Sequence, residues 1–132
     1  MNNNVIDLFA GCGGFSVGFE AAGFKITKAV EFDKQIAQTY AANHSGTKLF
    51  VDDIGNVDNE DYFKNGEAPI VVGGPPCQGF SMAGARIRGN SFIDDPRNYL
   101  FKHYVNVVRI VRPKVFVREN VKGILTRKGG EI

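Results

Sequence analysis

Residues 4–24, NVIDLFAGCGGFSVGFEAAGF, combine a short apolar run, a cluster of glycines and an amphipathic segment. Residues 4–10 predict a short buried strand, which the glycine cluster breaks. Apolar side chains then recur at helical spacing as far as Gly23, a typical helix stop: Phe15, Phe19 and Ala22. This stretch therefore predicts a strand, a glycine-rich turn and a helix in succession.

The same alternation continues along the chain. Further strands are predicted over residues 25–32, 48–54, 68–74 and 114–117, and helices over residues 33–44, 56–66 and 98–111. Alternating strands and helices indicate an α/β fold with a mostly parallel sheet and helices on both faces. Short apolar strands fit burial on both sides. At 132 residues the chain is expected to form one domain.

Two of the predicted helices carry clear local signals. Asp33 is a candidate N-cap for the helix over residues 33–44. The apolar face of that helix is expected to hold Ile36, Tyr40 and Ala41. The helix over residues 98–111 is strongly amphipathic, with an apolar side formed by Leu100, Tyr104, Val107, Val108 and Val111.

Ligands of open parallel sheets bind at the carboxyl ends of the strands. Gly11 and Gly13 follow the first predicted strand, although Ser16 stands where a dinucleotide fingerprint has its third glycine. Glu31 ends the second strand and is placed to accept hydrogen bonds from ribose hydroxyls. Asp53 follows the third strand and is placed to bind an adenine amino group. These positions favour an adenosine-type cofactor, and the alternative is ordinary glycine turns and helix caps.

The segment VVGGPPCQGFS, residues 71–81, places Cys77 behind two prolines and beyond a strand. Prolines restrict the backbone before the cysteine, which suits a thiol that must be aimed. A cysteine reacts as its thiolate. Because the restricted loop beyond the strand end would aim the thiol, we interpret Cys77 as a nucleophile. The alternative is a small buried hydrophobic residue.

Five motifs, in this order, resemble those of the cytosine-C5 DNA methyltransferases. They are DLFAGCGGFSVGFE for the cofactor loop, VEFDK for the ribose-binding acid, VDDI for the adenine-contacting turn, GGPPCQGFS for the catalytic loop and RPKVFVRENV for the Glu-Asn-Val motif. They cover nearly all of the chain. The resemblance implies a Rossmann-like methyltransferase fold, S-adenosyl-L-methionine as cofactor and DNA (cytosine-5-)-methyltransferase activity.

The resemblance also implies a cofactor pocket. Its residues would be Phe9, Gly11, Gly13, Gly14, Glu31, Phe32, Asp53, Ile54, Pro76 and Leu100. Phe9 and Phe32 would pack on the adenine, Glu31 would bind the ribose, and the glycines would face the methionine part.

The implied catalytic residues are Cys77 and Glu119. Attack of the Cys77 thiolate on C6 of cytosine makes C5 reactive, and Glu119 would hold the flipped-out base by its ring nitrogen. Weaker expectations place other side chains at the substrate: Gln78, Ser81, Arg86, Arg88 and Asn120. For the two arginines, solvated loop positions are an open alternative.

Charge is distributed unevenly. Residues 1–85 hold five Lys+Arg and ten Asp+Glu, a net of −5, whereas residues 86–132 hold eleven and four, a net of +7. The basic half favours an anionic partner such as nucleic acid, which the resemblance implies is DNA, and ordinary solvated surfaces are the alternative. The resemblance favours a bacterial restriction-modification enzyme, and a tRNA cytosine methyltransferase is the nearest alternative.

The sequence also predicts the cellular compartment of the protein and whether it binds a membrane or a metal. No apolar run is long enough to span a bilayer, and the start lacks a signal-peptide pattern. With Cys12 and Cys77 read as reduced thiols, we expect a cytoplasmic protein without a membrane partner. His44, expected at the surface, and His103, expected at the solvent or the core edge, lack metal-ligand partners, so no metal is expected.

Two departures from the family pattern stand out. Arg118 precedes Glu119 where an apolar strand residue is usual, and it could be a buried charge that needs a partner or could perturb Glu119. The chain also ends after about five strands, before the target-recognition region and the late motifs, which would leave the last strand as an edge of the sheet. We therefore expect residues 1–132 to be the amino-terminal part of the catalytic domain, completed by a carboxyl-terminal chain or domain. The alternative is a non-catalytic cofactor-binding fragment.

Overall fold

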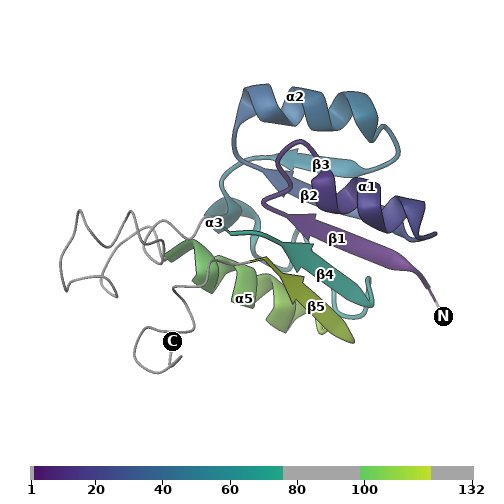
Figure 1. The fold of residues 1–132 in the computed structure, drawn as a ribbon. Coiled ribbons are helices and arrows are strands. Elements are labelled where there is room, and N and C mark those ends of the chain that lie inside the picture. The colour runs from purple at the N-terminus through teal and green to yellow at the C-terminus, as the bar shows by residue number, and fades with distance from the viewer. Residues whose placement is uncertain (1, 76–98, 120–132) are drawn as a thin grey trace, which may run out of the picture.

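The fold centres on one parallel sheet. The computed structural model describes residues 2–75 and 99–119. The strands are β1 (Asn4–Leu8), β2 (Lys25–Glu31), β3 (Lys48–Val51), β4 (Ile70–Gly73) and β5 (Val115–Arg118). Their order across the five-stranded sheet is β3-β2-β1-β4-β5, and every pair is parallel (Figure 1). The chain adds β2 and β3 on one side of β1 and then adds β4 and β5 on its other side. The strand order therefore reverses at β1.

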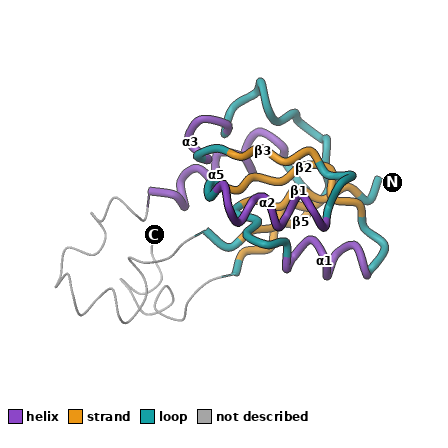
Figure 2. The backbone as a smooth tube through the Cα atoms, turned by 90° about the horizontal axis from the view of Figure 1, so that it is seen from above, coloured by secondary structure: helices purple, strands orange, loops and turns teal. Residues whose placement is uncertain are grey.

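The described helices cover both faces of this sheet. They are α1 (Gly14–Ala21), α2 (Lys34–Asn43), α3 (Ile54–Val57) and α5 (Tyr99–Val111). Helices α1 and α2 pack on one face, and α3 and α5 pack on the other, so the molecule has three layers. Figure 2 shows α1 and α3 on opposite sides of the strands.

Strand β1 shows how the sheet is buried on both sides. Ile6 and Leu8 join the core cluster of α3 and α5, and Val5 joins the cluster on which α1 packs. All three side chains are fully buried. Successive strand residues point to opposite faces, so a strand between two helical layers is mostly apolar in both directions. Asp7 is the buried polar exception in β1.

The fold prediction is confirmed, with three local differences. Ala37 and Tyr40 form the buried side of α2, whereas Ile36 is 38% exposed and Ala41 is exposed. The third helix is a single turn over Ile54–Val57 instead of residues 56–66. It starts earlier because Asp53 caps it, accepting a hydrogen bond from the Gly55 N–H at 2.8 Å.

The third difference concerns the edge of the sheet. The position of β5 at an edge was expected, but Val115, Phe116 and Val117 are all exposed, whereas the short apolar strands were expected to be buried on both faces. Among the described residues β5 pairs only with β4, so nothing in this part of the chain covers its outer edge.

No helix in the described part of the chain is long and apolar enough to cross a bilayer.

Gly73 is a point of close approach at the end of β4. A Cβ built on Gly73 would lie 2.5 Å from the Leu8 carbonyl oxygen and 3.1 Å from the ring of Tyr104. The Leu8 oxygen belongs to the backbone of the neighbouring strand and cannot rotate away. Glycine at this position therefore lets β1 and α5 close around the end of β4.

Substituting Gly73→Ala should lower the free energy of unfolding by about 1–3 kcal/mol, because the added methyl group overpacks a fixed backbone. Gly46→Ala is the matched control, since a Cβ there meets nothing within 4 Å. Urea unfolding followed by circular dichroism measures both variants. Equal stabilities of the two would contradict this packing argument.

Candidate cofactor site

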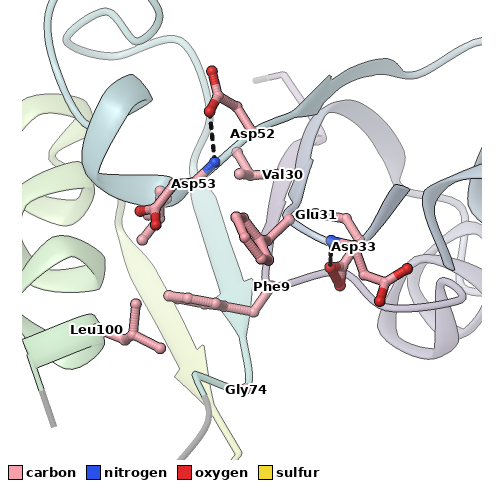
Figure 3. A pocket seen from close by; sticks show the side chains of 10 residues that line it. Phe9, Val30, Glu31, Asp33, Asp52, Asp53, Gly74 and Leu100 are labelled. Atoms are coloured by element: carbon pink, nitrogen blue, oxygen red, sulfur yellow. Dashed lines mark hydrogen bonds between the residues drawn. The ribbon is translucent and has the colours of Figure 1, made fainter. Parts of the chain in front are cut away.

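A cavity of about 360 Å³ opens at the carboxyl ends of the strands (Figure 3). It lies where the strand order reverses, the position at which open α/β sheets bind ligands. Its lining comes from the ends of β1, β2, β3 and β4 and from the start of α5. The residues are Phe9, Val30, Glu31, Phe32, Asp33, Asp52, Asp53, Ile54, Gly74 and Leu100.

Glu31 links two loops at the rim of this cavity. Its Oε1 accepts a hydrogen bond from the Gly11 N–H at 3.0 Å, and its Oε2 accepts one from the Asp33 N–H at 2.9 Å. Both bonds fix the carboxylate in place. Because a carboxylate has about four acceptor positions, each oxygen of Glu31 keeps capacity for a ligand hydroxyl.

Aromatic side chains provide the flat surfaces of the site. Phe9 has a left-handed backbone with φ of 55°, an uncommon conformation for a bulky residue that is often found at functional sites. Figure 3 shows its ring between Leu100 and Glu31. Phe32 is 70% exposed at the same cavity. An exposed aromatic ring next to a cavity is well suited to stack on a planar ligand.

The wall opposite Glu31 is the turn that begins α3. Ile54 is buried and lines the cavity, while Asp53 lines it and caps the helix. Asp52 accepts hydrogen bonds from the Asn56 side chain and the Asp53 N–H, which lower its pKa. Carboxylates therefore surround the apolar floor formed by Phe9, Ile54 and Leu100.

A buried polar network supports the glycine-rich loop from below. The Ser16 hydroxyl donates to Asp7 Oδ2 at 2.7 Å and lies 2.7 Å from the Tyr40 hydroxyl. The ring of Tyr40 stacks on that of His44, with centroids 4.5 Å apart. A Cβ on Gly13 would lie 2.5 Å from Nε2 of His44, so the imidazole occupies the space behind the loop.

The prediction that His44 lies at the surface is wrong. Its side chain is 1% exposed, and Nδ1 lies 3.2 Å from Glu20 Oε1. His44 was expected to face the solvent because it follows the last helical residue of α2, at the C-cap. The sequence carries no signal for the space behind Gly13, because that space is created by packing α1 against α2.

Of the two residues expected to be catalytic, Glu119 lies within the described ranges and Cys77 lies outside them. The N–H of Glu119 donates to the Gly73 carbonyl at 3.1 Å, and a Cβ on Gly74 would lie 3.1 Å from its Oε2. The Glu119 carboxylate thus lies over Gly74, which lines the cavity. Other predicted site residues lie outside the described ranges: Pro76, Cys77, Gln78, Ser81, Arg86, Arg88 and Asn120.

Of the predicted cofactor residues, six line the cavity: Phe9, Glu31, Phe32, Asp53, Ile54 and Leu100. Gly11 and Gly13 lie in the adjacent loop and Gly14 begins α1, all outside the lining. Positions Gly11 and Gly14 have open space on their Cβ side. The sequence reading did not name Val30, Asp33, Asp52 and Gly74 as cofactor residues, although each falls in or beside a strand-end segment.

Among the described residues, Arg118 meets an aromatic partner. Its guanidinium carbon lies 4.1 Å from the ring centroid of Phe101, a cation–π contact. Nε and Nη2 are shielded from solvent and have no hydrogen-bond partner among the described residues. Within the same ranges, no group of three or more His, Cys, Asp or Glu side chains could hold a metal ion.

Asp7, at the centre of the buried network, is an unusual carboxyl group. Burial raises its pKa from 3.8 to about 7, and the hydrogen bond from Ser16 offsets only part of this effect. Because the folded chain holds the proton more tightly than the unfolded chain, the contribution of Asp7 to stability is full below pH 3.8 and is lost as pH rises through about 7.

Asp7→Asn should therefore gain stability relative to the parent chain as pH rises from about 4 to about 7, by up to about 1.4 kcal/mol per pH unit. Urea unfolding at several pH values in this range measures the difference. Asp61→Asn, an exposed turn position, controls for the loss of a carboxylate. A difference between Asp7→Asn and the parent chain that stays constant with pH would contradict the burial argument.

Comparisons with known proteins identify the family of this chain. The C-5 cytosine-specific DNA methylase family matches residues 3–132. The type II methyltransferase M1.HphI of Haemophilus parahaemolyticus is 42% identical over 134 residues, which cover 99% of this chain and 36% of that protein. M.NgoPII of Neisseria gonorrhoeae is 46% identical over 124 residues, covering 94% and 35%.

A solved structure extends the likeness to three dimensions. A protein described as a DNA modification methyltransferase encoded within a prophage (E. coli) superposes with a TM-score of 0.74 at 36% identity, covering 95% of this chain and 34% of that one. The chain thus spans about a third of the length of the relatives it matches. Since the family match extends over nearly the whole sequence, the chain belongs to the C-5 cytosine-specific DNA methylase family.

Proposed function

We propose that the cavity at the carboxyl ends of β1–β4 binds S-adenosyl-L-methionine. The observation that carries this proposal is the anchored Glu31 carboxylate beside two aromatic rings in one cavity. Such a set suits the ribose and adenine of an adenosine. Membership of a methylase family makes S-adenosyl-L-methionine the adenosine cofactor to test first.

The residues divide between the parts of the cofactor. Phe9 and Phe32 would flank the adenine, with Ile54 and Leu100 completing the apolar surface and Asp53 accepting from the amino group. Glu31 would accept from the ribose hydroxyls. The open loop at Gly11 and Gly14 would receive the methionine part. When bound, the cofactor supplies an electrophilic methyl group.

The proposed reaction is transfer of that methyl group to C5 of a flipped-out cytosine in DNA. Cys77 would attack C6 as a thiolate, and the Glu119 carboxyl, in its protonated form, would donate a hydrogen bond to the ring nitrogen that gains electron density. After C5 has taken the methyl group, a base would remove the C5 proton and the Cys77–C6 bond would break, which releases the thiol and the methylated cytosine. The position of Glu119 over Gly74, three residues before Cys77, supports this pairing. The matched relatives are type II methyltransferases, which favours a bacterial restriction-modification setting in the cytoplasm.

A second polypeptide segment is also part of the proposal. Because the chain spans about a third of its relatives, residues 1–132 would be the amino-terminal part of a larger catalytic unit. The exposed apolar side chains of β5, Val115 and Phe116, lie at the outer edge of the described sheet. We propose that the complementing carboxyl-terminal part packs there and supplies the region that reads the DNA sequence.

Cofactor binding is tested on the chain itself. Calorimetric titration with S-adenosylhomocysteine should give saturable binding, and Glu31→Gln should weaken it by roughly tenfold or more, since the amide nitrogen cannot accept hydrogen bonds. Glu60→Gln, at an exposed position, is the matched control. Absence of binding by the parent chain, or equal binding by the Glu31 variant, would contradict the assignment.

Methyl transfer is tested with a DNA duplex that contains 5-fluorocytosine. The chain, mixed with S-adenosyl-L-methionine and the carboxyl-terminal part of the Haemophilus relative, should form a covalent adduct that Cys77→Ser abolishes. Trapping on a tRNA with the same modification, and not on DNA, would favour the RNA alternative. A failure to trap either substrate, while the intact relative traps DNA, would favour a non-catalytic cofactor-binding fragment.

A further inference from the structure

Helix α3 is too short to be stable without contacts to the rest of the protein. It is a single turn, Ile54–Val57, and a helix nucleus of this length is unfavourable without tertiary contacts. Yet this turn presents Asp53 and Ile54 to the cavity. The shape of that wall therefore depends on whatever holds α3 from outside.

His103 of α5 contacts both ends of this turn. Its Nδ1 lies 2.7 Å from Oδ2 of Asp58, the C-cap residue of α3. Because a carboxylate at this distance can only accept, Nδ1 carries the proton. At the other end, a Cβ on Gly55 would lie 3.3 Å from Cε1 of His103 and 3.2 Å from Oδ1 of Asp53. The imidazole thus lies directly behind the Asp53 cap.

Neighbouring side chains hold the imidazole and its partner in place. Asn106, one turn further along α5, donates to the same Asp58 oxygen at 2.9 Å. The ring of Tyr99 meets that of His103 edge-on, with centroids 4.5 Å apart. The side chains of His103 and Asp58 are only 13% and 10% exposed, which shields their bond from water.

The same helix also forms part of the cavity directly. Leu100 lies one turn before His103 and lines the floor next to Phe9. Helix α5 therefore supplies one surface of the cavity and fixes another. From the sequence, His103 was expected only at the solvent or the core edge. Its contact with Asp58 could not be predicted, because the two residues are 45 positions apart in the sequence.

We propose that His103 is a positioning residue of the cofactor site, which clamps α3 so that Asp53 and Ile54 meet the adenine. This inference rests on the proposed cofactor function. It assigns His103 no contact with the cofactor. Its effect passes through Asp58 and Gly55 to the turn.

His103→Ala should weaken binding of S-adenosylhomocysteine by roughly tenfold, the change that about 1.4 kcal/mol produces. Adenosine alone should lose the same factor, because the clamp acts on the adenine end. His103→Asn places an amide donor near the position of Nδ1 and should recover most of the loss. Arg109→Ala, exposed on the same helix, is the matched control and should bind like the parent.

Hydrogen exchange provides a readout that needs no ligand. The Asp58 N–H donates to the Ile54 carbonyl at 3.0 Å, so its exchange reports on the α3 turn. In His103→Ala it should speed up by roughly tenfold while amides of β1 and β4 keep their protection. If His103→Ala does not fold, Asp58→Ala removes the same bond from the other side and should weaken binding equally.

The outcomes separate the two proposals. Binding by the parent and undiminished binding by His103→Ala would overturn the clamp and leave the cofactor assignment intact. Unchanged exchange at Asp58 in that variant would overturn the clamp whatever the binding result. No binding by the parent chain would overturn the cofactor assignment and, with it, this inference.

Discussion

The carboxylate of Glu31 joins the two loops on which the rest of the site depends. It receives one backbone N–H from Gly11, after β1, and another from Asp33, before α2. This is possible only because β1 and β2 are neighbours in register, with Leu8 paired to Val30. The resulting geometry fixes the entrance of the glycine-rich turn and the start of α2 together, and it leaves the cavity between them open.

The two faces of the sheet then contribute different parts of the site. On one face, Ser16, Tyr40 and His44 fill the space beneath the glycine-rich loop and surround the buried Asp7 carboxyl. On the other face, α5 packs through Tyr104 and holds α3. A ligand at the strand ends would therefore meet a loop supported from one side and a turn supported from the other.

The sequence allowed the fold to be predicted because strand and helix signals alternate clearly and each strand carries a short run of apolar residues. It also placed Phe9, Glu31 and Asp53 at strand ends, which was enough to bring them into one cavity. Local patterns could not show how α1 packs on α2 or how α5 packs on α3. The roles of His44 and His103 arise from those contacts, between residues 24 and 45 positions apart, and so they escaped prediction.

The edge strand β5 illustrates a second limit. Its position at an edge of the sheet was predicted, but its apolar sequence also predicted burial on both faces. Burial depends on packed neighbours as well as on composition, and the described residues provide no strand on the outer side. An apolar strand left at an edge is a site for pairing with further chain. This agrees with the span of the family relatives, which are about three times as long as the matched region.

The central claim is that an adenosine cofactor binds across the carboxyl ends of β1–β4. Titration of the isotope-labelled chain with S-adenosylhomocysteine, followed by two-dimensional NMR of the backbone amides, tests it most directly. The account predicts the largest shifts at Phe9, Gly11, Phe32 and Ile54, and small shifts at Asn4 and Lys25, which begin β1 and β2 at the opposite end of the sheet. Saturable binding with shifts confined to any other surface would contradict it.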